Sequence, residues 1–233
     1  MGEMWQELQS NFVLNFVEDN RYMYLLKGLG NTLQITLYAG IVGVILGFLV
    51  AMVRSTHDKT GKFKLLDPLC RVYLTVIRGT PAMIQLLIIN FIVFGSMNVD
   101  GLIICTIAFG LNSGAYVAEI FRSGIMSVDQ GQVEAGRSLG LSYAKTMRLI
   151  IMPQAFKNVL PALANEFITL LKETSIIGTI GMMDLTRGAS IIQSRTYQPF
   201  MPLIAAALIY LVMVMGLTKL VNRMERRLRS NER

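Results

Sequence analysis

The sequence has few charged residues, two cysteines and one histidine. Only 16% of its 233 residues are Asp, Glu, Lys or Arg, whereas about a quarter is usual for a soluble domain. The composition therefore excludes a disordered tail, a nucleic-acid binder and an ordinary soluble domain. Cys70 and Cys105 are too few for a disulfide-stapled secreted domain, and together with His57 they lack the spacing of a metal or redox site.

Long uncharged runs dominate the chain instead. Hydrophobic residues make up 53% of the sequence, and the mean hydropathy is +0.50. A membrane helix needs about 20 mostly apolar residues. Four runs near this length contain no Asp, Glu, Lys or Arg: 28–53, 79–99, 101–118 and 196–218. The sequence thus predicts an all-α integral membrane protein.

The basic residues predict the orientation of these spans. The net charge of +7 is concentrated beside the apolar runs, above all in 54–78 and 219–233. Under the positive-inside rule both segments belong in the cytoplasm. Four crossings would place them on opposite faces, so a fifth is required, and 158–181 is the remaining apolar stretch. We therefore expect five spans, with the N-terminus outside and the C-terminus in the cytoplasm.

The chain divides into three parts. Residues 1–27 carry Glu3 and Glu7 without a basic region, so we expect no cleavable signal peptide. Apolar side chains recur in this part at helical spacing: Trp5, Leu8, Phe12 and Phe16. They predict an amphipathic helix on the bilayer surface, with a frayed tail as the alternative. Residues 28–221 form the transmembrane domain, and 222–233 form a basic cytoplasmic tail.

The loop 123–154 is too long and too well patterned for a simple connection. Asp129 can cap a helix that runs to Leu139, and Gly140 can end it in a left-handed conformation. Ser142 can cap a second helix, which we expect to end at Pro153. The loop also carries four apolar residues: Leu139, Leu141, Tyr143 and Met147. They can either fill a groove on a partner protein or pack on this chain's own helices.

The residues of this loop resemble a known motif. Glu134-Ala135-Gly136, Gly140, Ile150 and Met152-Pro153 follow the EAA motif of ATP-binding-cassette importer permeases, with Gly136 for the usual alanine and Met152 for leucine. Four further segments resemble the polar amino acid branch of that family, which covers histidine, glutamate, glutamine, arginine and opine permeases. They are Gly30-Asn31-Thr32-Leu33, Arg78-Gly79-Thr80-Pro81, Gly114-Ala115-Tyr116-Val117-Ala118-Glu119-Ile120 and Leu171-Lys172-Glu173-Thr174-Ser175.

The resemblance implies the five-helix, MetI-like fold of type I importers in the bacterial inner membrane. It also implies two cassette ATPase subunits, a second permease copy or a paralogue, and an extracytoplasmic binding protein that delivers an amino acid. The loop would be the coupling helix that docks on the ATPase, through Glu134, Ala135, Gly136, Arg137 and Gly140. The other expected partner of the chain is membrane lipid, and we expect no binding of nucleic acid.

The resemblance further implies a non-catalytic subunit that binds no cofactor, with ATP and Mg²⁺ held by the ATPase subunits. The sequence agrees. The phosphate-binding loop of ATPases has the pattern Gly-x-x-x-x-Gly-Lys followed by Ser or Thr. Here Gly61-Lys62 is followed by Phe63, and position 56 is not glycine, so the pattern is absent.

Polar residues inside the spans are candidates for the substrate path, because a polar side chain inside a membrane needs either a bonding partner or a water-filled cavity. Asn112, Tyr116 and Glu119 share one helix face. Asn112 lies about 17 Å deep, which suits a binding site, and Glu119 lies near the cytoplasm, which suits a gate. Glu119 can instead pair with Arg122. Lys172 can meet a substrate carboxylate or form a buried salt bridge. Thr80 and Gln85 complete this group.

Two other classes of function remain as alternatives. A secondary amino acid transporter or channel would work without ATP. Two features count against it: the predicted spans contain few charged residues, and the longest ordered loop, 123–154, is a compact cytoplasmic element. A structural membrane anchor would leave Lys172 and Asn112 unexplained. Only the importer permease predicts a cassette ATPase in stoichiometric amount after pull-down from a detergent extract.

Overall fold

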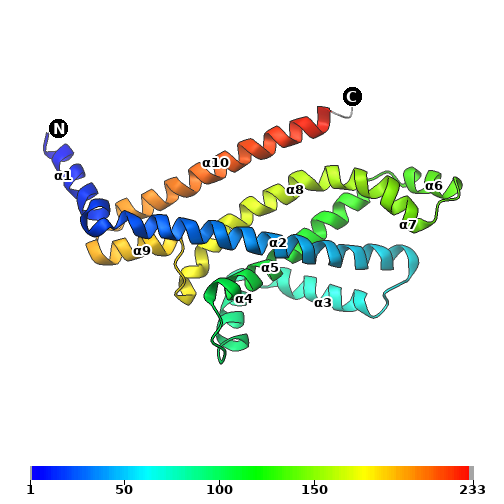
Figure 1. Ribbon diagram of the computed structural model, residues 1–233, viewed down its shortest axis with the longest axis horizontal. Coiled ribbons are helices and arrows are strands. Elements are labelled where there is room, and N and C mark those ends of the chain that lie inside the picture. The colour runs from blue at the N-terminus through cyan, green and yellow to red at the C-terminus, as the bar shows by residue number, and fades with distance from the viewer. Residues whose placement is uncertain (1, 231–233) are drawn as a thin grey trace.

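The computed structural model describes residues 2–230, and all regular secondary structure in this part of the chain is helical. Four long helices lie alongside one another (Figure 1): α2 (Tyr22–Thr60), α5 (Gly101–Met126), α8 (Met152–Glu173) and α10 (Phe200–Ser230). At about 1.5 Å per residue, α2 is about 58 Å long and exceeds a hydrocarbon core of about 30 Å. By length and composition, α2, α5 and α10 can each cross a membrane. Helix α8 carries four charged residues and is less apolar.

The helix of the second predicted span begins directly after Pro81, and it follows a helix that we did not predict. Residues Leu66–Gly79 form a separate helix, α3, and α4 (Ala82–Ile88) continues into a π-helical turn, Ile89–Val93. The two parts meet at an angle of 111°. Thr80 and Pro81 are both extended at the break. Proline imposes this conformation on the residue before it and has no N–H to continue the helix.

Small residues let α2 and α5 pack closely. Gly43 faces Ser113, and a Cβ added at Gly47 would lie 2.5 Å from the Cγ1 of Val117. Gly110 of α5 makes the reciprocal contact with Val42. Backbones that approach this closely associate without polar groups, which is typical of helices in lipid. Helix α5 is accordingly the most enclosed of the three apolar helices.

The additional span predicted at residues 158–181 corresponds to most of α8 and a 3-10 segment, Thr174–Ile180. Leu170 and Ile177 from these elements are fully buried, in a cluster with Ile35, Leu86 and Phe109. A helix that we did not predict, α9 (Leu185–Thr196), follows; the Asp184 carboxylate caps it by accepting from the Arg187 N–H at 2.9 Å.

The N-terminal segment is helical, as predicted. Helix α1 (Gly2–Phe12) is followed by a π-helical turn, Val13–Val17, and a 3-10 turn, Glu18–Asn20. Trp5 and Leu8 are exposed. The buried Asn15 holds the segment to the loop before α10, because its amide donates to Gln198 at 2.7 Å. The position of α1 on a bilayer surface stays a prediction, and Met1 and 231–233 lie outside the described residues.

Candidate functional site

The loop between α5 and α8 folds into a compact knob. Helix α6 (Gln130–Ser138) begins at Asp129, whose carboxylate accepts from the Gly131 N–H at 2.6 Å. Gly140 then has a φ of 78°, in the left-handed region. Ser142 caps α7 (Tyr143–Thr146). These three local predictions are confirmed.

The end of the second knob helix differs from our prediction. Helix α7 does not stop at Pro153 but passes through a π-helical turn, Met147–Ile151, into α8. Pro153 lies in the first turn of α8, directly after the π-helical turn. The knob is therefore continuous with the helix that follows it.

The motif residues divide into buried and exposed positions. Gly136 is buried, and a Cβ there would lie 2.7 Å from the Cγ2 of Thr146, so α6 approaches α7 more closely than alanine allows. Glu134, Ala135 and Arg137 lie on the exposed side of α6. These exposed residues are free to contact a partner protein.

The four apolar residues of the knob also differ in their exposure. Leu139 is 80% exposed, whereas Met147 is buried in this chain's own core. Tyr143 packs at the edge of that core, and burial raises the pKa of its phenol. Met147 and Tyr143 therefore pack on this chain's own helices, whereas a partner groove for Leu139 stays a prediction.

The knob is packed against the ends of both neighbouring helices. Ile125 of α5 and the adjoining Val128 form one cluster with Met147, Ile151 and Ala155. Next to this cluster, Gly124 leaves no room for a side chain, because a Cβ there would overlap Val159 of α8. The knob is therefore fixed directly to the ends of α5 and α8.

A polar groove of about 530 Å³ runs between α5 and α8. Its polar side chains are Tyr116, Glu119, Ser123, Ser127, Asn158 and Glu166. Ser113 donates to Glu166 at 2.9 Å, and Asn158 donates to Ser127 at 2.9 Å. Our site prediction included Tyr116 and Glu119 but missed Glu166. A carboxylate in an otherwise apolar segment was the available signal.

Glu119 also borders a second pocket, of about 630 Å³, which is lined by Arg54, Arg71 and Arg78. Its carboxylate lies 3.4 Å from Arg54, 3.5 Å from Arg78 and 4.0 Å from Arg122. The expected pair with Arg122 is thus the longest of three. Glu119 holds together helices α2, α3 and α5 at the point where the two pockets meet.

The ion pairs continue away from the pocket through two carboxylates that the sequence analysis missed. Asp67 accepts from Arg71 at 2.6 Å and lies 3.7 Å from Arg54. Asp58 lies 3.7 Å from Arg71 and 3.6 Å from Arg122. Four arginines and three carboxylates therefore form one network. Two of its pairs have a local signal in the sequence, Asp67 with Arg71 at i, i+4 and Glu119 with Arg122 at i, i+3.

Gln85 and Asn112 lie at the break between α3 and α4 rather than along either pocket. The Gln85 amide donates to the carbonyls of Ile77 at 2.7 Å and Thr80 at 3.0 Å, and to the Thr80 hydroxyl at 2.8 Å. Asn112 donates to the Gln85 oxygen at 2.9 Å. Both side chains are less than 10% exposed. Gln85 thereby satisfies backbone groups that the break leaves free, and Asn112 holds the Gln85 side chain in place.

Lys172 lies in the last turn of α8, not near the middle of an unbroken helix. Its side chain is exposed and makes no hydrogen bond or ion pair with any residue from 2 to 230. The structure therefore does not bring Lys172 together with the other predicted path residues, and its role stays a prediction.

The helical arrangement, the polar groove and the knob are features of a transport subunit, and comparison with known proteins agrees. Residues 43–230 match the model of the family described as "Binding-protein-dependent transport system inner membrane component". The chain belongs to this family. It is the non-catalytic permease subunit of an ATP-binding-cassette importer, located in the inner membrane, and the ATPase is a separate subunit.

Named relatives cover almost the whole chain. The arginine transport system permease protein ArtQ of Bacillus subtilis is 40% identical over 211 residues, which are 90% of this chain and 94% of that protein. A putative glutamine transport system permease protein, GlnP of Rickettsia bellii, is 38% identical over 210 residues, 89% of this chain and 94% of the relative.

Solved structures share the fold. A chain from the crystal structure of an amino acid ABC transporter with histidines has a TM-score of 0.83 and 45% identity, over 91% of this chain and 98% of that chain. A chain of the MetNI methionine ABC transporter has a TM-score of 0.75 at 19% identity, over 89% of this chain and 97% of that chain. The second likeness supports the MetI-like fold alone.

Proposed function

We propose that this permease moves a polar α-amino acid into the cytoplasm by alternating access. The observation that carries the proposal is a pair of adjoining pockets that share Tyr116 and Glu119: the groove between α5 and α8 holds the Glu166 carboxylate, and the second pocket holds three arginines. An amino acid has an ammonium and a carboxylate, and the two pockets together offer a group of opposite charge to each. Relatives named for arginine, glutamine and cystine transport support the same substrate class.

We further propose five membrane crossings, by α2, the α3–α4 pair, α5, α8 and α10, with the N-terminus outside and the C-terminus in the cytoplasm. The alternating directions of these helices along the molecule (Figure 1) support this topology. So does the crowding of basic residues near the ends of α2 and α10, because the positive-inside rule places both ends in the cytoplasm. Helix α1 would then lie on the outer surface.

The proposed assembly contains two permease chains, identical or paralogous, two ATPase subunits that hold ATP and Mg²⁺, and an extracytoplasmic binding protein. The knob is the part of this chain that would meet the ATPase, through Glu134, Arg137 and Leu139. Because the knob is packed on α5 and α8, closure of the ATPase pair would turn both walls of the groove together. The path residues Thr80, Gln85, Asn112 and Lys172 keep their proposed role near the substrate.

Uptake by the reconstituted complex tests this function. Proteoliposomes that contain the permease, its ATPase and the binding protein should accumulate one radiolabelled polar amino acid from a panel only when ATP is enclosed. Accumulation without ATP would instead favour a secondary transporter.

Cysteine labelling tests the topology separately. In a chain with Cys70 and Cys105 replaced, Ser10→Cys should react with an impermeant reagent on spheroplasts, whereas Asn222→Cys should react only after lysis. The reverse pattern would overturn the orientation.

A further inference from the structure

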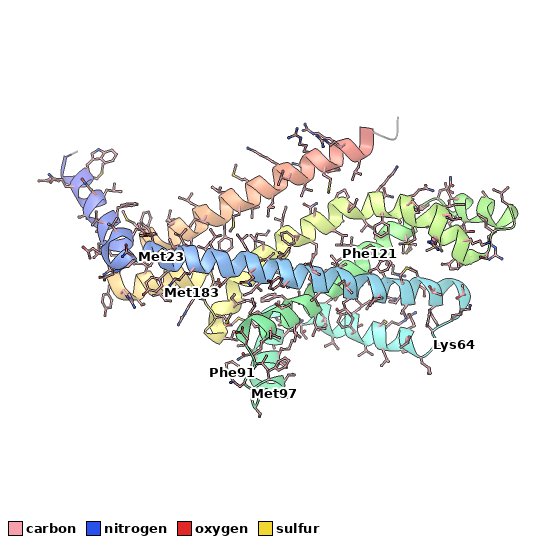
Figure 2. All side chains as sticks on the ribbon, viewed as in Figure 1. Met23, Lys64, Phe91, Met97, Phe121 and Met183 are labelled. Carbon is pink, nitrogen blue, oxygen red and sulfur yellow. The ribbon has the colours of Figure 1, made fainter. Side chains whose placement is uncertain are left out.

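A groove of about 780 Å³ separates the C-terminal third of α2 from α7 and the start of α8. Its inner half is apolar and is lined by Phe48 and Met52 of α2 and by Met152 and Phe156 of α8. The rings of Phe48 and Phe156 are stacked at 6.4 Å, and Phe121, labelled in Figure 2, packs edge-on against Phe48 at 5.2 Å. The inner half is thus a rigid aromatic and methionine surface.

The outer end of the groove has the opposite character. Lys62 and Arg148 line it, together with the hydroxyl-bearing residues Thr60 and Ser142. Both basic side chains are exposed, and neither forms an ion pair with a carboxylate of residues 2–230. By contrast, the arginines on the opposite side of α2 are held by three carboxylates. Two cations are therefore available at one end of an apolar groove.

The apolar and basic residues of the groove are arranged along the direction in which α2 crosses the membrane. The charge-free run of α2 ends at Val53, so Phe48 and Met52 lie within it and Thr60 lies beyond it. From Phe48 to Thr60 the groove follows 12 residues of helix, or about 18 Å. One leaflet contributes about 15 Å of a hydrocarbon core of about 30 Å. The groove therefore covers nearly the depth of one leaflet and reaches the level of the lipid headgroups.

We propose that this groove binds one anionic phospholipid. Its acyl chain lies along Phe48, Met52 and Phe156, and its phosphate lies between Lys62 and Arg148, where hydroxyls supply further donors. The volume is that of a site for a small ligand, and basic residues between helices at the inner surface suit anionic headgroups. The bound lipid would fill the gap between α2 and the knob. This inference does not depend on which amino acid is transported.

Native mass spectrometry of the purified permease–ATPase complex tests the proposal. The complex is titrated with dioleoyl-phosphatidylglycerol and, separately, with the zwitterionic dioleoyl-phosphatidylcholine. We expect one anionic lipid per permease chain to bind at least about tenfold more tightly than the zwitterionic lipid. The double variant Lys62→Gln/Arg148→Gln should remove this preference.

A matched control removes the same charge from the same two loops but outside the groove. Lys64, at the turn between α2 and α3 (Figure 2), and Lys145 of α7 are exposed and do not line it. The variant Lys64→Gln/Lys145→Gln should keep the lipid. Equal losses in both double variants would mean general surface attraction and would overturn the site.

A third variant separates a lipid from free phosphate. Met52→Trp fills the apolar half without changing charge, so it should weaken phosphatidylglycerol binding while the complex still elutes intact. Unchanged binding would show that only a phosphate group is held, and the proposal would fail. Binding to the permease alone but not to the complex would mean that the ATPase fills the groove, which would also overturn it.

Discussion

Replacing Gln85 by leucine tests the structural account of the helix break most directly. The Gln85 amide nitrogen reaches Ile77 at 2.7 Å and Thr80 at 2.8 and 3.0 Å, and its oxygen accepts from Asn112 at 2.9 Å. Leucine keeps most of the bulk but none of these contacts. The carbonyls at the end of α3 and the Asn112 amide would then lack partners in a region where water is scarce.

The expected loss of stability follows from these four contacts. Hydrogen bonds inside membrane proteins average about 0.6 kcal/mol, which gives roughly 2 to 3 kcal/mol for four. A buried polar group without a partner adds a cost of about 1 to 3 kcal/mol. We therefore expect Gln85→Leu to destabilise the protein by at least about 3 kcal/mol. A change of 1 kcal/mol moves the Tm of a protein of this size by about 2 to 4 °C, so the Tm should fall by at least about 6 °C.

The assay is thermal unfolding of the purified permease in detergent. Gln34→Leu is the matched control, because Gln34 is exposed on α2 and its side chain makes only a 3.4 Å contact with Tyr38. It should change the Tm by less than 2 °C. Asn112→Ala should add much less than its own effect when it is combined with Gln85→Leu. Equal Tm values for the two glutamine variants, or full additivity with Asn112→Ala, would refute the reasoning.

Three further predictions concern the knob and the ion-pair network. Glu134→Lys should leave the permease folded but reduce the ATPase recovered with it at least threefold, because it reverses a charge on the docking side; full recovery would contradict this. Gly136→Val should have the same effect, because its side chain would force α6 away from Thr146; unchanged recovery would contradict this. Glu119→Gln leaves four arginines with two carboxylates and should destabilise the permease by about 1 kcal/mol. Salt at 0.5 M should reverse part of that loss, since it screens repulsion between arginines.

The sequence predicted those elements whose signals are local. The knob followed from Asp129, Gly140 and Ser142, because a cap or a left-handed turn is set within a few residues. Glycines at helical spacing on α2, such as Gly43 and Gly47, permit close helix contact but do not identify α5 as the partner. The determining residues of the knob lie within one or two turns of each feature, so no knowledge of tertiary packing was needed there.

The helix before Pro81 was not predicted, because charge was used to define loops. Arg71 and Arg78 suggested a cytoplasmic connection, yet both lie on α3 and pair with residues of neighbouring helices. Likewise, Gln85 satisfies the backbone at the break, a role that depends on a fold in three dimensions. The ion-pair network brings together α2, α3 and α5, and such pairing cannot be read from spacing along one helix.

The packing of the knob limits how the permease can move. Val128, Met147 and Ile151 join the knob to the ends of α5 and α8, and Gly124 and Val159 hold these two helices in contact. The walls of the polar groove are therefore fixed to each other at the knob, and a push on the knob cannot open the groove there. It can only turn α5 and α8 as a unit against their surroundings. Helix α2 would follow through its tight contact with α5, so alternating access would require motion between whole chains rather than within one.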